Sequence, residues 1–178
     1  MRSYMKLFAA SFVALTFCGT AFAKSTIQEI GDYTQVLVPL YALALTLNEE
    51  NGEGTKQLIY SFAATQATVE ILKAAVDAPR PDGSDSRSFP SGHAASAFSG
   101  ATFIHKRYGF QKAIIPYLLA GFTGYSRVYA NRHYTRDVVA SALISGLYTW
   151  LFVDEYNPGP LQVSVGPGSI RLAYVIDF

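Results

Sequence analysis

The sequence has 178 residues, which is enough for one domain with a substantial core and too few for two comfortable ones. Half of the residues are hydrophobic and only 15% are charged, so the chain is more apolar than most soluble domains. The net charge is +1, and there is no basic run, no zinc-type spacing of cysteine and histidine and no glycine-rich nucleotide loop. These features exclude nucleic acid as an expected partner.

Residues 1–23 have the features of a secretory signal peptide. Two basic residues precede the apolar segment LFAASFVALTFCGT, and the small-residue segment AFA before Lys24 suits a cleavage site. The single cysteine, Cys18, lies inside this leader, so we expect no disulfide in the mature chain. Residues 24–178 are expected to form one domain outside the cytoplasm, and the sequence leaves open whether the leader is cut or kept as a first span.

Five apolar segments bounded by polar residues predict five helices. These are Tyr33–Leu47, Lys56–Val76, His93–His105, Ala113–Ser126 and Asp137–Val153. The predicted fold class is all-α, a compact bundle of about five apolar helices with a helical core over about residues 31–153. Most of these helices are shorter than the ~20 residues of a membrane span, yet they lack polar faces.

The C-terminal segment, about residues 160–178, differs because β-branched residues alternate around the turn sequence GPGS. This pattern predicts a short β-hairpin-like tail. We expect it to lie as an edge ribbon packed on the helical bundle.

The order of the helices predicts which loops share a face. If the leader delivers Lys24 to the outside, the loops PRPDGSDSRSFPSG and RVYANRHYTR lie together on the outer face. The basic loop HKRYGFQK then lies inside, as the positive-inside tendency prefers. This topology favours a bundle embedded in or associated with the inner membrane of a bacterial envelope, with the outer loops in the periplasm. A soluble periplasmic protein is the alternative.

The outer loops contain residues suited to bind a phosphate group. Lys73, Arg80 and Arg127 are three cations that could surround a dianion, the arginines bidentately. The hydroxyl of Ser91 and the backbone amides that begin with Gly92, where an Ala-rich helix starts, would contact the same oxygens.

Two histidines in the same loops are suited to phosphoryl transfer. One histidine must attack phosphorus while another protonates the leaving oxygen, and His93 and His133 are the candidates. Asp137 lies one helical turn beyond His133, close enough to hold one ring N–H and leave the other nitrogen free to attack. His105 lies in the opposite loop and receives no role.

Each of these residues also has an ordinary structural interpretation. Lys73 is typical of a charge at a helix C-terminus, and Asp137 is typical of a helix N-cap. Their convergence on one face, under a topology derived without them, favours a functional site.

Three sequence blocks carry a resemblance to a known family. The patterns K-x6-R-P (Lys73 to Pro81), P-S-G-H (Pro90 to His93) and S-R-x5-H-x3-D (Ser126 to Asp137) match the tripartite signature of the type-2 phosphatidic acid phosphatase superfamily. All three blocks are complete and in order, and together they span 65 of the 178 residues. The helical pattern extends the resemblance to most of the mature chain.

The resemblance implies hydrolysis of phosphomonoesters or diphosphates without a metal ion or another cofactor. It implies that His133 is the nucleophile that forms a phosphohistidine, that Asp137 orients it and that His93 protonates the leaving group. The implied phosphate-binding residues are Lys73, Arg80, Ser91, Gly92 and Arg127. Two features depart from the common family plan: five helices follow the leader where six spans are usual, and the β-like tail is not part of the family core.

The sequence therefore predicts a metal-independent phosphatase, with a phosphorylated lipid or a small phosphoester as its partner. Phosphatidic acid, phosphatidylglycerol phosphate, a polyprenyl diphosphate and a lipid A phosphate all remain open as substrates. A soluble periplasmic acid phosphatase, a vanadate-dependent haloperoxidase and a non-catalytic envelope protein are the alternatives.

Overall fold

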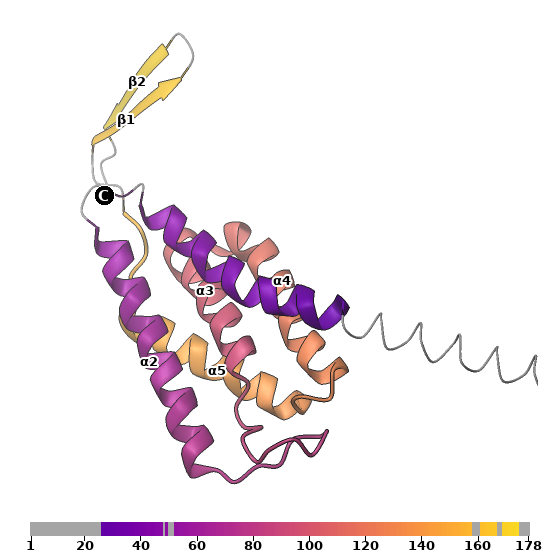
Figure 1. The fold of residues 1–178 in the computed structure, drawn as a ribbon. Coiled ribbons are helices and arrows are strands. Elements are labelled where there is room, and N and C mark those ends of the chain that lie inside the picture. The colour runs from indigo at the N-terminus through magenta and orange to yellow at the C-terminus, as the bar shows by residue number, and fades with distance from the viewer. Residues whose placement is uncertain (1–25, 48, 50–51, 158–160, 167–168, 175–178) are drawn as a thin grey trace, which may run out of the picture.

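The computed structural model describes residues 26–47, 49, 52–157, 161–166 and 169–174. The described part contains an N-terminal helix over residues 26–46 and four further helices: α2 (Glu53–Ala75), α3 (Gly92–Tyr108), α4 (Phe110–Tyr129) and α5 (Thr135–Phe152) (Figure 1). The all-helical bundle expected from the sequence is thus confirmed for the core. The predicted signal peptide over residues 1–23 lies outside the described residues.

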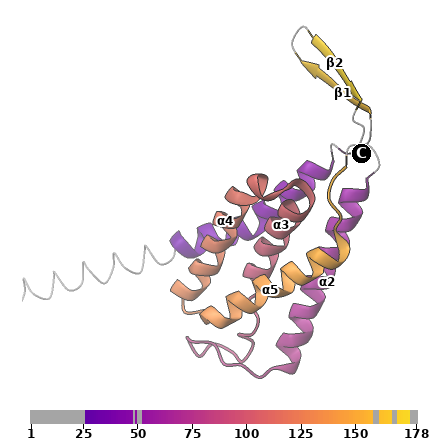
Figure 2. The ribbon, with the colours of Figure 1, turned by 180° about the vertical axis from the view of Figure 1, so that it is seen from behind.

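Helix α3 lies at the centre of the bundle and packs against α2, α4 and α5 (Figure 2). Its small residues permit this close approach, because Ala94, Ala97 and Ala101 are fully buried. Gly100 faces the N-terminal helix so closely that an added Cβ would lie 2.7 Å from the backbone nitrogen of Pro39. The central helix therefore fixes the positions of all its neighbours.

The observed helices are longer than the apolar segments from which they were predicted. The N-terminal helix begins seven residues before the predicted start at Tyr33, and α3 and α4 extend until a single residue, Gly109, joins them. Gly109 has φ of 90°, a conformation that favours glycine and allows the chain to reverse in one residue. The polar residues on both sides were expected to be loop, but tertiary packing keeps them helical.

The bundle interior is built largely from small polar side chains. On α5 the buried residues are Asp137, Ser141, Ser145 and Thr149, whereas Leu143 is exposed. Hydroxyl pairs join the helices, including Thr102 with Thr149 at 2.7 Å. The large apolar side chains therefore lie mostly on the outside, which explains why the helices lack polar faces in sequence. Among the residues described here, no helix is both long enough and apolar enough to cross a membrane.

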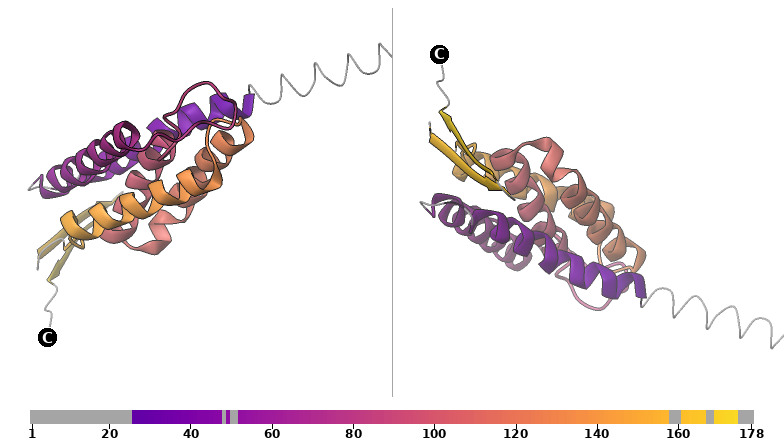
Figure 3. Two further views of the ribbon diagram at one scale, coloured as in Figure 1. Left: turned by 90° about the horizontal axis from the view of Figure 1, so that it is seen from below. Right: turned by 90° about the horizontal axis from the view of Figure 1, so that it is seen from above.

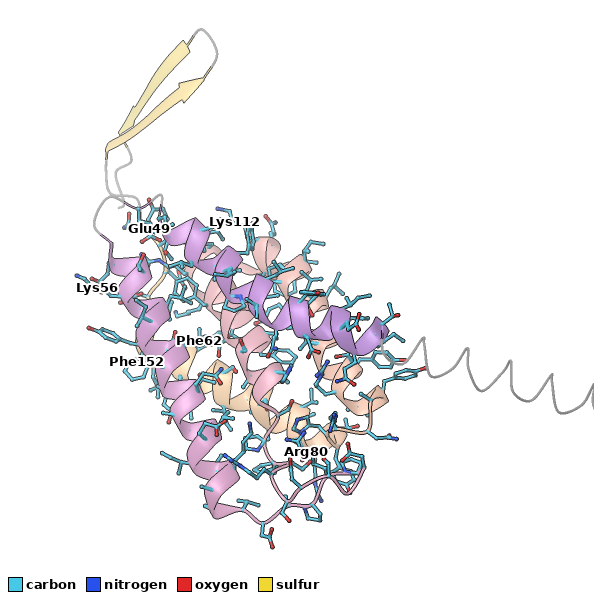
Figure 4. All side chains as sticks on the ribbon, in the orientation of Figure 1. Glu49, Lys56, Phe62, Arg80, Lys112 and Phe152 are labelled. Atoms are coloured by element: carbon cyan, nitrogen blue, oxygen red, sulfur yellow. The ribbon has the colours of Figure 1, made fainter. Side chains whose placement is uncertain are left out.

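A buried ion pair closes the end of the bundle near the hairpin. The guanidinium of Arg107 contacts both carboxylate oxygens of Glu49, at 2.7 and 2.6 Å. Arg107 also donates to the Gln57 side chain at 3.0 Å, and the Tyr108 hydroxyl donates to Glu49 at 2.6 Å. This cluster joins the N-terminal segment to α2 and α3, and Figure 4 shows Glu49 at the opposite end of the molecule from Arg80.

The chain continues into two antiparallel strands, β1 (Leu161–Gly166) and β2 (Ser169–Tyr174). Leu161 pairs with Tyr174, and Gly166 pairs with Ser169 next to the turn. The two strands project from the end of the bundle in Figure 1, and neither contacts α2, α3, α4 or α5. We expected this hairpin to pack on the bundle as an edge ribbon. It packs on none of these four helices, so the expectation was wrong for them.

Candidate active site

A polar cavity of about 430 Å³ lies at the end of the bundle where Arg80 is labelled in Figure 4. It is formed by three polar residues of the N-terminal helix, the end of α2, the start of α3, the end of α4 and two loops. Its lining residues are Gln28, Asp32, Gln35, Lys73, Arg80, Gly92, His93, Arg127, Arg132 and His133. Six of the eight residues predicted from the sequence thus surround one space, and the other two, Ser91 and Asp137, lie buried behind it.

His133 is held in the loop between α4 and α5 with its ring almost completely buried. Its Nδ1 atom lies 2.7 Å from the backbone carbonyl oxygen of Ser88. Because a carbonyl can only accept, Nδ1 carries the hydrogen and Nε2 keeps its lone pair. Burial is the main effect that lowers the pKa of His133 to about 4; the charges of Arg80 and Lys73 contribute to this shift, and the Ser88 carbonyl opposes it. The ring is therefore neutral near pH 7 and can act as a nucleophile.

Asp137 lies near His133 but does not accept its ring hydrogen. The closest carboxylate oxygen is 3.6 Å from Nδ1, while the Ser88 carbonyl takes the hydrogen bond. That same oxygen accepts hydrogen bonds from the Ser88 hydroxyl at 2.6 Å and from the Tyr134 backbone N–H at 2.9 Å. Asp137 thereby caps α5 and fixes Ser88, so it acts on His133 through the segment that holds the ring.

His93 lies in the first turn of α3 and faces the cavity. Its Nε2 atom is 2.9 Å from a carboxylate oxygen of Asp32, on the N-terminal helix. Burial is the main effect that lowers the pKa of His93; the charges of Arg127 and Lys73 add to it, and Asp32 opposes it. The protonation state of His93 therefore depends on a balance between one carboxylate and several cations.

The start of α3 brings Lys73 against the helix backbone. A Cβ on Gly92 would lie 3.0 Å from the Lys73 ammonium nitrogen, so the absence of a side chain leaves room for this cation. Ser91 is the N-cap of α3, and its hydroxyl accepts from the Ala94 N–H at 3.4 Å. Ser91 is fully buried, so the structure places its side chain as a helix cap rather than on the cavity wall.

Each cation that lines the cavity is paired with a carboxylate. Lys73 contacts Glu70 at 3.1 Å, Arg80 contacts Asp85 at 2.7 Å, and Arg132 contacts Asp82 at 3.1 Å. Arg127 is the most enclosed of the four. Its three nitrogens contact Ser126 Oγ at 3.1 Å, the Gln28 carbonyl at 2.6 Å and Asp32 at 2.8 Å. These pairs hold the cations in place around the space an anion would enter.

Two residues of this site, Asp32 and Ser88, were not predicted from the sequence. Asp32 was missed because the first helix was predicted to begin at Tyr33, one residue later. The signal was present, since Gln28, Asp32 and Gln35 form a polar stripe at helical spacing in an otherwise apolar segment. No pattern indicated Ser88, because its contact with His133 is made by a backbone carbonyl.

His105, which received no role, lies outside the cavity. Its ring packs among Phe110, Tyr117 and Trp150, and its Nδ1 atom lies 3.0 Å from the Tyr117 hydroxyl. The described residues contain no group of three or more His, Cys, Asp or Glu side chains arranged to hold a metal ion.

Comparison with known proteins identifies the family. A sequence profile of the PAP2 superfamily matches residues 54–157, which include all three signature blocks. A lipid A 4'-phosphatase of Helicobacter pylori is 32% identical over 143 residues, covering 74% of this chain and 72% of that protein. The chain belongs to the PAP2 superfamily. The resemblance inferred from the three signature blocks is therefore confirmed, and the chain is an enzyme of the phosphatase class.

Other relatives of this PAP2 chain match it over different lengths. A lipid A 1-phosphatase of Porphyromonas gingivalis is 44% identical over 68 residues, which cover 36% of this chain and 15% of that protein. The crystal structure of Aquifex aeolicus LpxE superposes with a TM-score of 0.61 and 26% identity, covering 73% of this chain and 84% of that one. The helical arrangement described above is thus the PAP2 fold.

Proposed function

We propose that this PAP2 enzyme hydrolyses the phosphate ester of a phosphorylated lipid through a phosphohistidine on His133. The observation that carries the proposal is the hydrogen bond from Nδ1 of His133 to the Ser88 carbonyl, which leaves Nε2 free beside a cavity lined by cations. Lys73, Arg80, Arg127 and the N-terminus of α3 at Gly92 bind the phosphoryl oxygens. Ser91 supports them by capping α3.

The proposed reaction has two steps. First, the Nε2 lone pair of His133 attacks phosphorus, the bond from phosphorus to the leaving oxygen breaks, and protonated His93 gives that oxygen a proton. Second, water attacks the phosphohistidine, the phosphorus–nitrogen bond breaks, and neutral His93 accepts a proton from the water. Phosphate leaves, and both histidines return to their starting states.

Positive charge develops on the ring of His133 as the phosphorus–nitrogen bond forms. The Ser88 carbonyl oxygen at 2.7 Å and the Asp137 carboxylate at 3.6 Å are both placed to stabilise this charge. Both groups are buried and fixed before the substrate binds, so little reorganisation is needed during the reaction. We therefore assign Asp137 an orienting and electrostatic role rather than that of a direct hydrogen-bond acceptor.

An apolar groove next to the cavity supports a lipid substrate. The groove has a volume of about 400 Å³ and is lined mainly by the N-terminal helix and α2. These helices lie on the same side of the bundle in Figure 3 and diverge from the end near the hairpin in Figure 1. Its lining residues are Val36, Pro39, Leu40, Leu43, Leu58, Ile59, Phe62, Ala63 and Ser96. Val36 directly follows Gln35 of the cavity wall, and Ser96 lies one turn of α3 beyond His93.

The groove thus begins within one helical turn of residues that line the phosphate site, and we assign it to an acyl chain of the substrate. From Gln35 to Leu43 the N-terminal helix advances about 12 Å, which is long enough for a substantial part of a fatty acyl chain. The exposed apolar side chains on the outer faces of the helices, such as Leu143, Leu147 and Trp150, further support action at a lipid surface.

The relatives suggest which lipid to examine first. The two curated relatives described above are named lipid A phosphatases. We propose a lipid A phosphate as the first candidate substrate, with the cavity facing the periplasm.

Release of inorganic phosphate tests the proposed function. Wild type and His133→Ala, purified in mild detergent with EDTA present, would be given lipid A, phosphatidic acid, phosphatidylglycerol phosphate, a polyprenyl diphosphate and small soluble esters. We expect turnover by wild type only, with a lipid preferred. Turnover that EDTA abolishes would contradict the metal-independent mechanism, and a preference for small esters would contradict the lipid assignment.

A charge placed in the groove tests the acyl-chain assignment. Phe62→Glu should lower kcat/KM at least tenfold for a long-chain lipid phosphate and leave a short soluble ester almost unaffected. Ile71→Glu is the matched control, because Ile71 is exposed on the same helix and does not line the groove. Equal losses in the two variants would contradict the assignment.

A further inference from the structure

We propose that Asp32 is a positioning residue for His93, the proton donor to the leaving group. It holds the His93 ring in place and links it to Arg127, which binds the phosphate. This inference rests on the proposed phosphatase function. It assigns a role to a residue of the N-terminal helix that precedes the stretch matched by the family profile, residues 54–157.

One carboxylate oxygen of Asp32 makes both contacts. Its Oδ1 atom lies 2.9 Å from Nε2 of His93 and 2.8 Å from a terminal nitrogen of Arg127. The side chain of Asp32 is 41% exposed and lies on the cavity wall beside His93. The Nε2–H of His93 therefore points at Asp32 along the cavity wall, and a leaving oxygen would replace Asp32 as the acceptor of this hydrogen.

The N-terminal helix is shaped to bring Asp32 to this position. Gly31 lies against α4 so closely that any side chain there would overlap the hydroxyl of Ser126 and approach Arg127. One turn earlier, the Gln28 carbonyl accepts a hydrogen bond from Arg127 at 2.6 Å. The helix is therefore fixed against Arg127 by its backbone, and Asp32 is placed by that contact.

The charges around His93 give Asp32 a specific electrostatic effect. The groups that face the cavity with His93 are Lys73 from α2, Arg127 from α4, and Arg80, Arg132 and His133 from the loops. Asp32 is the one carboxylate among the described lining residues. Burial and the nearby cations lower the pKa of His93, and Asp32 raises it, so Asp32 favours the protonated ring that a general acid requires.

The same negative charge opposes the binding of an anion. Asp32 occupies one face of Arg127 and lies among cations that would otherwise attract phosphate more strongly. Removing its charge should therefore weaken proton donation and at the same time strengthen anion binding. Damage to the fold would weaken both, so the two effects together distinguish a positioning role from a structural one.

The test compares Asp32→Asn with wild type on two classes of soluble ester. An alkyl phosphate needs a proton on its leaving oxygen, whereas 4-nitrophenyl phosphate does not. We expect kcat/KM to fall at least tenfold for the alkyl ester and less than threefold for the nitrophenyl ester. The inhibition constant for vanadate should stay the same or fall, and the basic limb of the kcat/KM profile should move to lower pH.

Three further variants sharpen the comparison. Asp82→Asn removes a carboxylate that pairs with Arg132 and does not contact His93, so it should leave the dependence on the leaving group unchanged. Asp32→Glu should recover part of the alkyl-ester activity. In the His93→Ala background, Asp32→Asn should add no further dependence on the leaving group.

The outcomes separate this inference from the proposed function. Equal losses for both esters, or weaker vanadate inhibition in folded Asp32→Asn, would overturn the role of Asp32 while wild-type turnover still supported the phosphatase. A folded wild type that released phosphate from no ester would overturn the function and the role of Asp32 together.

Discussion

The Nδ1 atom of His133 lies 2.7 Å from the backbone carbonyl oxygen of Ser88. This contact links the loop after α4 to the segment that leads into α3. Because the acceptor is a backbone carbonyl, the contact depends on the path of the loop, which the hydrogen bond from the Ser88 hydroxyl to Asp137 helps to fix. The position of the candidate nucleophile is therefore set by the same segment that starts the helix carrying His93.

Replacing His133 should abolish turnover. The ring provides the only atom for which we propose a bond to phosphorus, so His133→Ala should reduce phosphate release to background. The side chain is only 4% exposed, so some loss of stability is expected, and circular dichroism and the Tm would show whether the fold is kept. His105→Ala is the matched control, because His105 lies outside the cavity, and it should retain turnover.

Replacing Asp137 with asparagine should separate activity from stability. An amide oxygen at the position of Oδ2 can still accept from the Ser88 hydroxyl and the Tyr134 N–H, so α5 should keep its cap. The negative charge near His133 is lost, and kcat/KM should fall at least tenfold. Thermal melting and phosphate release measure the two effects. A rate close to that of wild type would show that the charge has no part in the reaction.

The sequence predicted which residues lie together around one cavity better than it predicted the helix boundaries. Lys73, Arg80 and the two histidines were identified because their spacing carries chemistry that few other patterns require. Asp32 was missed because an apolar scan places the start of a helix at its first hydrophobic run, and the polar stripe before Tyr33 was excluded. Side-chain periodicity also carries no information on a backbone contact such as that of Ser88.

The interior of the bundle explains the remaining differences. Sequence reasoning treats apolar residues as core, but here Ser141, Ser145 and Thr149 are buried while Leu143 and Leu147 are exposed. Hydroxyl groups in helices can bond to the carbonyl four residues earlier, as Ser145 does with Ser141 at 2.8 Å, and so can be buried without leaving an unpaired group. The pattern therefore predicted the five helices that the described residues form, but not which face of each lies inside.

Adding one methyl group at Gly92 should weaken the phosphate site. Its Cβ would lie 3.0 Å from the Lys73 ammonium nitrogen, so in Gly92→Ala this flexible cation must shift by a few tenths of an ångström. We expect kcat/KM to fall several-fold and vanadate to bind more weakly. The fold should be kept, because alanine in a helix is more favourable than glycine by about 1 kcal/mol.

Gly121→Ala is the control for this substitution. It lies on α4 with nothing within 4 Å of an added Cβ, so it should leave activity unchanged and raise the Tm slightly. Equal kinetic effects of the two substitutions would contradict the close approach of Lys73 to Gly92.

Both activity and stability should depend on pH through His133. Its pKa is lowered by burial to about 4, compared with about 6.5 in an unfolded chain, so the neutral nucleophile persists well below pH 6. The acid limb of the kcat/KM profile should therefore lie near pH 4 to 5. An acid limb near pH 6.5, the ordinary value for histidine, would contradict the lowered pKa of the nucleophile.

The same shift makes folding less favourable in acid. Between pH 6.5 and 4 the unfolded chain binds a proton at His133 that the folded chain does not, so the free energy of unfolding decreases as pH falls. From pH 7 to pH 5 this group alone should remove about 2 kcal/mol, a loss measurable by denaturant titration. His133→Ala should show a smaller dependence over this range, and an equal dependence would mean that other groups are responsible.

Breaking the ion pair at the other end of the bundle should destabilise the protein without altering the site directly. Arg107 and Glu49 are both buried, and Glu49→Gln would leave the guanidinium without a charged partner. Removing one member of a buried pair typically costs about 3 to 5 kcal/mol, so the Tm should fall by many degrees. At temperatures where the variant is folded, KM should match that of wild type. A changed KM would show that the ion pair between Arg107 and Glu49 also sets the spacing of the N-terminal helix and α2. The width of the groove between these helices would then depend on this pair.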